Sequence, residues 1–178
     1  MVLPPAVAGI ALLMAFGRRG LFGQWLASAG VEIVFTPVAV ILAQLFIAAP
    51  FYVKAATSGF RVVNHEAEEA AMLDGASAWQ VFRYVTLPLA FTALLGGAVM
   101  TWPRATGEFG ATLIFAGNFP GRTQTMPLAI YMGFEINLNI ATTLSVILIC
   151  LSFLTLIIIK GILHRQVGAD LEVRSASS

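Results

Sequence analysis

The residues best suited to specific chemistry gather in a polar insert at residues 59–85, between two long apolar runs. Four carboxylates fall within nine residues there: Glu66, Glu68, Glu69 and Asp74. Such a density of charge cannot lie in hydrocarbon. Carboxylates can pair with basic groups of another protein, and Trp79 and Phe82 supply the aromatic anchors that dominate interfaces. The insert is predicted to dock a partner, with an ordinary loop between two spans as the simpler alternative.

A second pair of charges lies within an otherwise apolar stretch. Arg104 and Glu108 stand four residues apart, so on a helix they would share one face and could pair. An ionisable group at membrane depth costs about 2.5–3.5 kcal/mol unless it is paired or wet. The pair could therefore hold helices together, or it could line a path through the membrane.

The rest of the chain offers no catalytic or metal-binding pattern. Cys150 is the only cysteine, and its apolar surroundings predict a small buried side chain. His65 and His164 are far apart, so solvated positions near an interface are expected for both. Neither of the two lysines, Lys54 and Lys160, ends a phosphate-binding loop, so any ATP site must belong to a partner. A net charge of +1 argues against nucleic-acid binding.

Composition indicates the elements that must position these residues. Of 178 residues, 58% are hydrophobic and 11% are charged, with a mean hydropathy of +0.87. Soluble domains carry about 25% charged residues, so an all-α integral membrane protein is predicted. Apolar runs predict spans at about 2–16, 36–58, 87–103 continuing to 116, and 139–159. Residues 1–165 would form the membrane domain, with an external loop at 117–127 and a disordered tail at 166–178.

The insert itself is predicted to be a helix, a tight turn and a second helix lying along the membrane surface. Asn64 is a suitable N-cap for a helix that runs to about Leu73. Gly75 can take the left-handed conformation that ends that helix. Ser77 and Gln80 have the spacing of a capping box, which predicts that a second short helix begins there.

The order of residues in the insert resembles the EAA motif of ABC importer permeases. Glu69-Ala70-Ala71 is followed after three residues by Gly75, and after nine more by Val85-Thr86-Leu87-Pro88. The resemblance implies a cytoplasmic coupling helix that docks onto a separate ATPase. The coupling residues would be Glu68, Glu69, Ala70, Ala71, Asp74, Gly75, Trp79, Phe82, Leu87 and Pro88.

A second block is similar to the oxyanion branch of these permeases. It comprises Gly107-Glu108-Phe109-Gly110-Ala111-Thr112, then Ala116-Gly117-Asn118, then the run from Thr123 to Tyr131. The sequence of this block is most similar to those of the molybdate and tungstate members, and sulfate permeases share part of it. The likeness covers residues 2 to about 165. Residues implied at the gate or translocation path are Arg104, Thr106, Gly107, Glu108, Phe109, Gly110 and Thr112. Glu108 is favoured as structural, because a carboxylate would repel a divalent anion, whereas Arg104 could attract one.

The resemblance also implies the setting in which the chain works. The chain would be a multi-pass protein of the prokaryotic inner membrane that binds no cofactor itself. Its partners would be an ABC ATPase that holds ATP and Mg, a periplasmic or lipoprotein oxyanion-binding protein, a second permease copy in a homodimer, and membrane lipid. Family members carry one or two further helices before the Leu3-Pro4-Pro5 segment, so a missing natural beginning is expected. A sulfate permease, a channel or secondary transporter not coupled to ATP, and a non-functional truncated permease remain as alternatives.

Overall fold

The computed structural model of the chain describes the backbone of residues 3–176 and the exposure of residues 3–157 and 161. Regular structure within residues 3–176 is entirely helical. Contacts divide the chain into two compact units, Met1–Pro50 with Trp102–Ser152 and Phe51–Thr101 with Phe153–Ser178. The elements in chain order are α1 (Pro5–Phe16), α2 (Gly23–Ser28), α3 (Pro37–Arg61), α4 (His65–Leu73), α5 (Ala78–Val81), the π-helix η1 (Phe82–Thr86), α6 (Leu87–Thr106), α7 (Gly110–Ala116), α8 (Met126–Ile136) and α9 (Leu138–Ala176).

Three helical stretches in the described chain are long and apolar enough to cross a membrane: Pro37–Arg61, Ala78–Thr106 and Leu138–Ile157. Their lengths of 25, 29 and 20 residues meet the requirement of about 20 residues for a bilayer core. The predicted all-α membrane fold is therefore confirmed. The first expected span corresponds to α1, which has 12 residues and is too short to cross by itself.

The span that begins in the insert differs from the prediction at both ends. The second short helix does not stop before Leu87-Pro88, because α5 continues through η1 into α6. Proline lacks an N–H and crowds the carbonyl four residues earlier, and the wider π turn just before Pro88 lets the helix continue past it. At the other end, α6 stops at Thr106 instead of running on to 116, and α7 begins as a new helix at Gly110.

The end of the chain also differs from its predicted form. A span at 139–159 followed by a disordered tail at 166–178 was expected, but α9 continues to Ala176. Residues beyond 160 contain no proline and several good helix formers, which favours continuation of the helix. Residues 177–178 and the side chain of His164 lie outside the described part of the chain.

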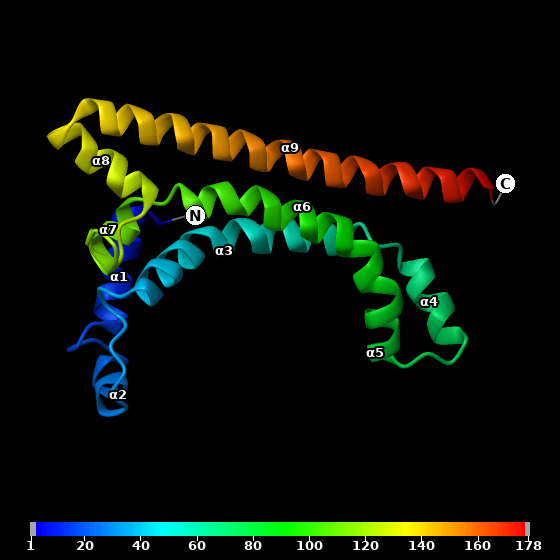
Figure 1. Ribbon diagram of the computed structural model, residues 1–178. Helices are drawn as coiled ribbons and strands as arrows, with labels where there is room; N and C mark the ends of the chain where they lie inside the picture. The colour runs from blue at the N-terminus through cyan, green and yellow to red at the C-terminus, as the bar shows by residue number, and fades with distance from the viewer. Residues whose placement is uncertain (1–2, 177–178) are drawn as a thin grey trace. The chain divides into compact units, whose positions relative to one another are not determined.

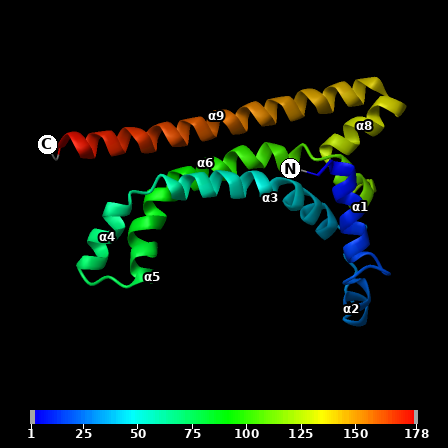
Figure 2. The ribbon, with the colours of Figure 1, turned by 180° about the vertical axis from the view of Figure 1, so that it is seen from behind.

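In the first unit the core forms where α1 packs on α7, which lie side by side in Figures 1 and 2. A Cβ added at Gly9 would lie 2.9 Å from the Ala111 Cα, so the two helices approach more closely than a larger residue would permit. Phe115 of α7 is fully buried and its ring lies 6.2 Å from that of Phe16. Buried residues of α3, including Ala39, Ala43 and Ile47, complete this core.

In the second unit α3 and α6 pack through small residues. A Cβ added at Gly59 would lie 2.6 Å from the Ala93 Cβ, and one added at Gly97 would lie 2.7 Å from the Ala55 Cβ. Small residues let membrane helices approach closely enough for backbone packing. Only the second glycine of the Gly96-Gly97 pair does this, because an added Cβ at Gly96 would meet no atom within 4 Å.

Much of the apolar surface of α9 is exposed in the isolated chain. Cys150 is exposed rather than buried as predicted, and Val146 and Ile149 on the same helix are exposed too. Only 6% of the apolar window Leu138–Ile157 is buried. Such a surface is what a helix facing lipid or a second chain would show.

Candidate functional site

The insert forms a capped helix hairpin. Asn64 precedes α4, and its side-chain oxygen accepts a hydrogen bond from the Glu66 N–H at 3.0 Å. The helix ends at Leu73, and Gly75 has a φ of +90°, a value that favours glycine. The predicted cap, helix and turn of this segment are therefore confirmed.

The second half of the hairpin begins with a complete capping box. The Gln80 N–H donates to the Ser77 hydroxyl at 3.4 Å, and the Ser77 N–H donates to the Gln80 side-chain oxygen at 2.8 Å. These bonds satisfy N–H groups that have no partner inside the helix. The predicted start of the second helix is confirmed, and from there the helix continues unbroken to Thr106.

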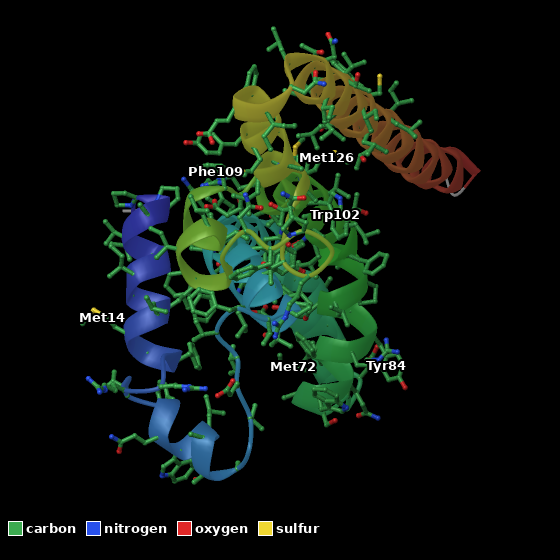
Figure 3. All side chains as sticks on the ribbon, turned by 60° about the vertical axis from the view of Figure 1, so that its left-hand side comes forward. Met14, Met72, Tyr84, Trp102, Phe109 and Met126 are labelled. Carbon is green, nitrogen blue, oxygen red and sulfur yellow. The ribbon has the colours of Figure 1, made fainter. Side chains whose placement is uncertain are left out.

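The coupling residues predicted from the sequence divide by exposure. Glu69, Ala70, Asp74, Trp79 and Pro88 are exposed, whereas Ala71 and Leu87 are partly covered. Figure 3 shows Tyr84 pointing away from its helix, and this residue is 73% exposed.

Sequence reasoning missed three exposed apolar residues of the hairpin: Met72, Leu73 and Tyr84. Leu73, the last residue of α4, is 89% exposed. The available signal was the pair of adjacent apolar residues Met72 and Leu73 beside four carboxylates, since exposed apolar patches rimmed by polar residues mark interaction sites.

Glu68 is turned toward its own chain. Its Oε1 accepts a hydrogen bond from the Thr86 hydroxyl at 2.5 Å, and its Oε2 lies 3.3 Å from the His65 Nδ1. The Glu68 side chain is 17% exposed, whereas that of His65 is 87% exposed. His65 is thus solvated, as expected, but it also contacts Glu68. Glu68 and Glu69 were predicted to face the same partner, and the structure separates them.

Aromatic rings connect the hairpin to the end of α3. The rings of Phe60 and Phe82 stack with their centroids 6.5 Å apart, and those of Trp79 and Phe82 lie 5.7 Å apart. Phe82 therefore joins the last turn of α3 to the first turn of the second hairpin helix. Movement of the hairpin would act on both spans of this unit through these contacts.

The charged pair of the second block lies at the junction of α6 and α7. The Arg104 Nη1 lies 3.1 Å from the Glu108 Oε2, so the predicted pair is present. Glu108 is 1% exposed, and its Oε1 also accepts a hydrogen bond from the Ala111 N–H at 2.9 Å. Glu108 thereby satisfies one of the N–H groups in the first turn of α7, although the N-cap residue of this helix is Phe109.

The other residues predicted at the gate make separate local contacts within the described part of the chain. Thr106 donates to the carbonyls of Trp102 and Pro103, both at 3.2 Å. A Cβ added at Gly110 would lie 3.2 Å from the Pro5 Cβ, so this glycine supports the close contact with α1. Thr112 is fully buried, and its hydroxyl has no hydrogen-bond partner among the described atoms.

Gly107 and Phe109 instead line a shallow, mostly apolar groove with residues of α8 and α9. The ring of Phe109 meets that of Tyr131 at a centroid distance of 5.3 Å. Within the described residues, no group of three or more His, Cys, Asp or Glu side chains could hold a metal ion.

The amino-acid sequence of the chain matches a known protein family and several named relatives. The family described as "binding-protein-dependent transport system inner membrane component" matches residues 1–169. The chain is 42% identical over 157 residues to the molybdenum transport system permease protein ModB of Mycobacterium tuberculosis, covering 88% of this chain and 60% of ModB. It is 42% identical over 132 residues to ModB of Haemophilus influenzae, covering 74% and 58%.

A relative that is named for sulfate transport also matches. The sulfate transport system permease protein CysW of Synechococcus elongatus is 34% identical over 165 residues, which cover 92% of this chain and 57% of CysW. The chain thus spans about three fifths of the length of each of these relatives.

Proposed function

Because the chain belongs to the family of binding-protein-dependent transport system inner membrane components, we propose that it is a permease subunit of an ABC importer. The observation that supports this most is the capped hairpin, which presents Glu69, Ala70 and Leu73 and is continuous with the candidate span Ala78–Thr106. A helix hairpin of this kind can dock into a groove on a partner ATPase, which would hold ATP and Mg.

Continuity between hairpin and span supplies a route for coupling. ATP binding would close a pair of ATPase subunits and draw together the hairpins of two permease copies in a homodimer. Since α5, η1 and α6 form one uninterrupted helix, displacement of its exposed end moves the membrane segment with it. Rigid-body movement of this kind is a common way to open a gate between subunits. The chain itself forms and breaks no covalent bond in this account.

We propose an oxyanion as the substrate, molybdate or tungstate before sulfate. Identity to the molybdenum permeases is 42%, against 34% to the sulfate permease. All three anions are tetrahedral dianions of similar size, so a separate periplasmic or lipoprotein binding protein would make the finer distinction. The permease would mainly offer a passage.

Within that passage we assign Arg104 and Glu108 a structural role. The pair carries no net charge, and Glu108 holds the first turn of α7 through the Ala111 N–H. A buried carboxylate with two partners at a helix junction is a fixed structural element, whereas a binding site for a dianion would need an excess of positive charge or free donors.

Docking of the ATPase is the step to test. The chain would be expressed with its neighbouring ATPase and purified in detergent as wild type, Glu69→Lys and the matched control Glu135→Lys. Glu135 is an exposed carboxylate on α8, outside the insert. We expect the ATPase to remain with wild type and Glu135→Lys, and its affinity to fall about tenfold or more in Glu69→Lys, since reversing an interfacial charge costs a few kcal/mol. A folded chain that never binds the ATPase would instead favour a channel or a secondary carrier.

A further inference from the structure

We propose that Glu68 and Thr86 form an internal tie that fixes the hairpin to the membrane span, and that Glu68 is a positioning residue rather than a contact for the ATPase. The role assigned to the tie rests on the proposed function, whereas the tie itself is a property of this chain alone. The two side chains belong to different helices and lie 18 residues apart in sequence.

The geometry of the tie is that of a strong hydrogen bond. The Thr86 hydroxyl donates to the Glu68 Oε1 at 2.5 Å, a distance typical of a hydroxyl bound to a carboxylate. The Glu68 side chain is largely shielded from water, and the His65 Nδ1 lies 3.3 Å from its second oxygen. Both carboxylate oxygens are therefore engaged within the chain, while the neighbouring Glu69 remains exposed.

Thr86 differs from three other threonines on the helices of this chain. Thr57, Thr101 and Thr143 donate to the backbone carbonyl four residues earlier in their own helix. A hydroxyl has one proton to donate, and the short bond to Glu68 takes the proton that Thr86 could otherwise direct to a carbonyl of its own helix. Thr86 lies in the π-helical turn η1, where the backbone spacing departs from that of an α-helix. The chain thus directs this hydroxyl across to α4.

The position of the tie explains what it can do. At one end of the hairpin, the loop at residues 74–77 connects the last residue of α4 to the first residue of α5. At the opposite end, the bond between Glu68 and Thr86 connects the first turn of α4 to the last residue of η1, which lies immediately before α6. With both ends fastened, a force on α4 reaches α6 directly instead of through the loop alone.

The tie can be tested without any partner by hydrogen–deuterium exchange in the full chain in lipid. Thr86→Val removes the hydroxyl at nearly constant shape, and Thr86→Ser restores it. We expect amide exchange of residues 66–73 to rise about tenfold in Thr86→Val, to return toward wild type in Thr86→Ser, and to be unchanged in the control Glu69→Gln. The effects of Glu68→Leu and Thr86→Val should not add, because both remove the same bond. Equal exchange in Thr86→Val and wild type, or full additivity, would overturn the tie.

Its role in coupling is tested in the complex with the ATPase. We expect Thr86→Val to keep the ATPase bound, because Glu69 and Leu73 are untouched, but to raise the number of ATP molecules hydrolysed per anion moved at least threefold. Thr86→Ser should restore the wild-type ratio, which a change in folded amount alone would not do. An unchanged ratio in Thr86→Val would overturn the role in coupling. Failure of the wild-type chain to bind the ATPase would refute the proposed function, and the exchange result would still decide whether the tie exists.

Discussion

The packing of α3 on α6 makes a sharp prediction about two adjacent glycines. A Cβ added at Gly97 would lie 2.7 Å from the Ala55 Cβ, closer than two such atoms can approach, whereas one added at Gly96 would meet nothing within 4 Å. Gly97→Ala must therefore push the helices apart or shift the backbone, and overpacking of this kind costs about 1–3 kcal/mol. Both substitutions gain the same helix propensity, about 1 kcal/mol. The difference between the two variants thus isolates the steric cost.

The assay is the free energy of unfolding in mixed detergent micelles, measured for wild type, Gly96→Ala and Gly97→Ala. We expect Gly96→Ala to be as stable as wild type or up to about 1 kcal/mol more stable. Gly97→Ala should be about 1–3 kcal/mol less stable than Gly96→Ala. Equal stability of the two variants would refute the close contact between α3 and α6, and with it the packing of the second unit.

Substitutions at three further positions test the junction and the hairpin through the free energy of unfolding or local exchange. Glu108→Ala should lower the unfolding free energy by about 1.5–3 kcal/mol, because it removes the charged acceptor for the Ala111 N–H. Glu108→Gln keeps an acceptor and should lose less than half of that. Equal losses in the two variants would show that the bond to the Ala111 N–H is unimportant. Gly75→Ala should destabilise the hairpin by about 1 kcal/mol through backbone strain alone, because an added Cβ there has open space, and unchanged exchange in α4 would contradict this. Ser77→Ala should cost about 1 kcal/mol by removing the cap on the Gln80 N–H, and it should raise amide exchange at the start of α5 but not in α8.

Local signals in the sequence predicted the hairpin well. Asn64, Gly75 and the Ser77–Gln80 box act through bonds within a few residues, so their spacing alone determines the caps and the turn. Arg104 and Glu108 also pair as predicted, but Glu108 lies after the end of α6, so the pair does not depend on the shared helix face from which it was predicted.

Features that depend on tertiary contacts could not be read in the same way. Nothing in the spacing of Glu68 and Thr86 shows that they meet, because their contact depends on how α4 folds back on η1. The break after Thr106 is accompanied by the bond from the Ala111 N–H to Glu108, and the helix that continues past Pro88 contains a π turn that has no simple sequence signature. The exposed state of Cys150 also escaped prediction, since an apolar neighbourhood in sequence does not tell a buried face from one that faces lipid.

The central claim is that this chain forms the membrane passage of an ATP-driven oxyanion importer. The most direct test is uptake of labelled molybdate into vesicles that contain the chain, its ATPase and the binding protein. The account predicts uptake that requires ATP and the binding protein, that is competed by tungstate more strongly than by sulfate, and that falls at least threefold relative to ATP hydrolysis in Thr86→Val. Uptake that proceeds without ATP and follows an ion gradient would contradict it.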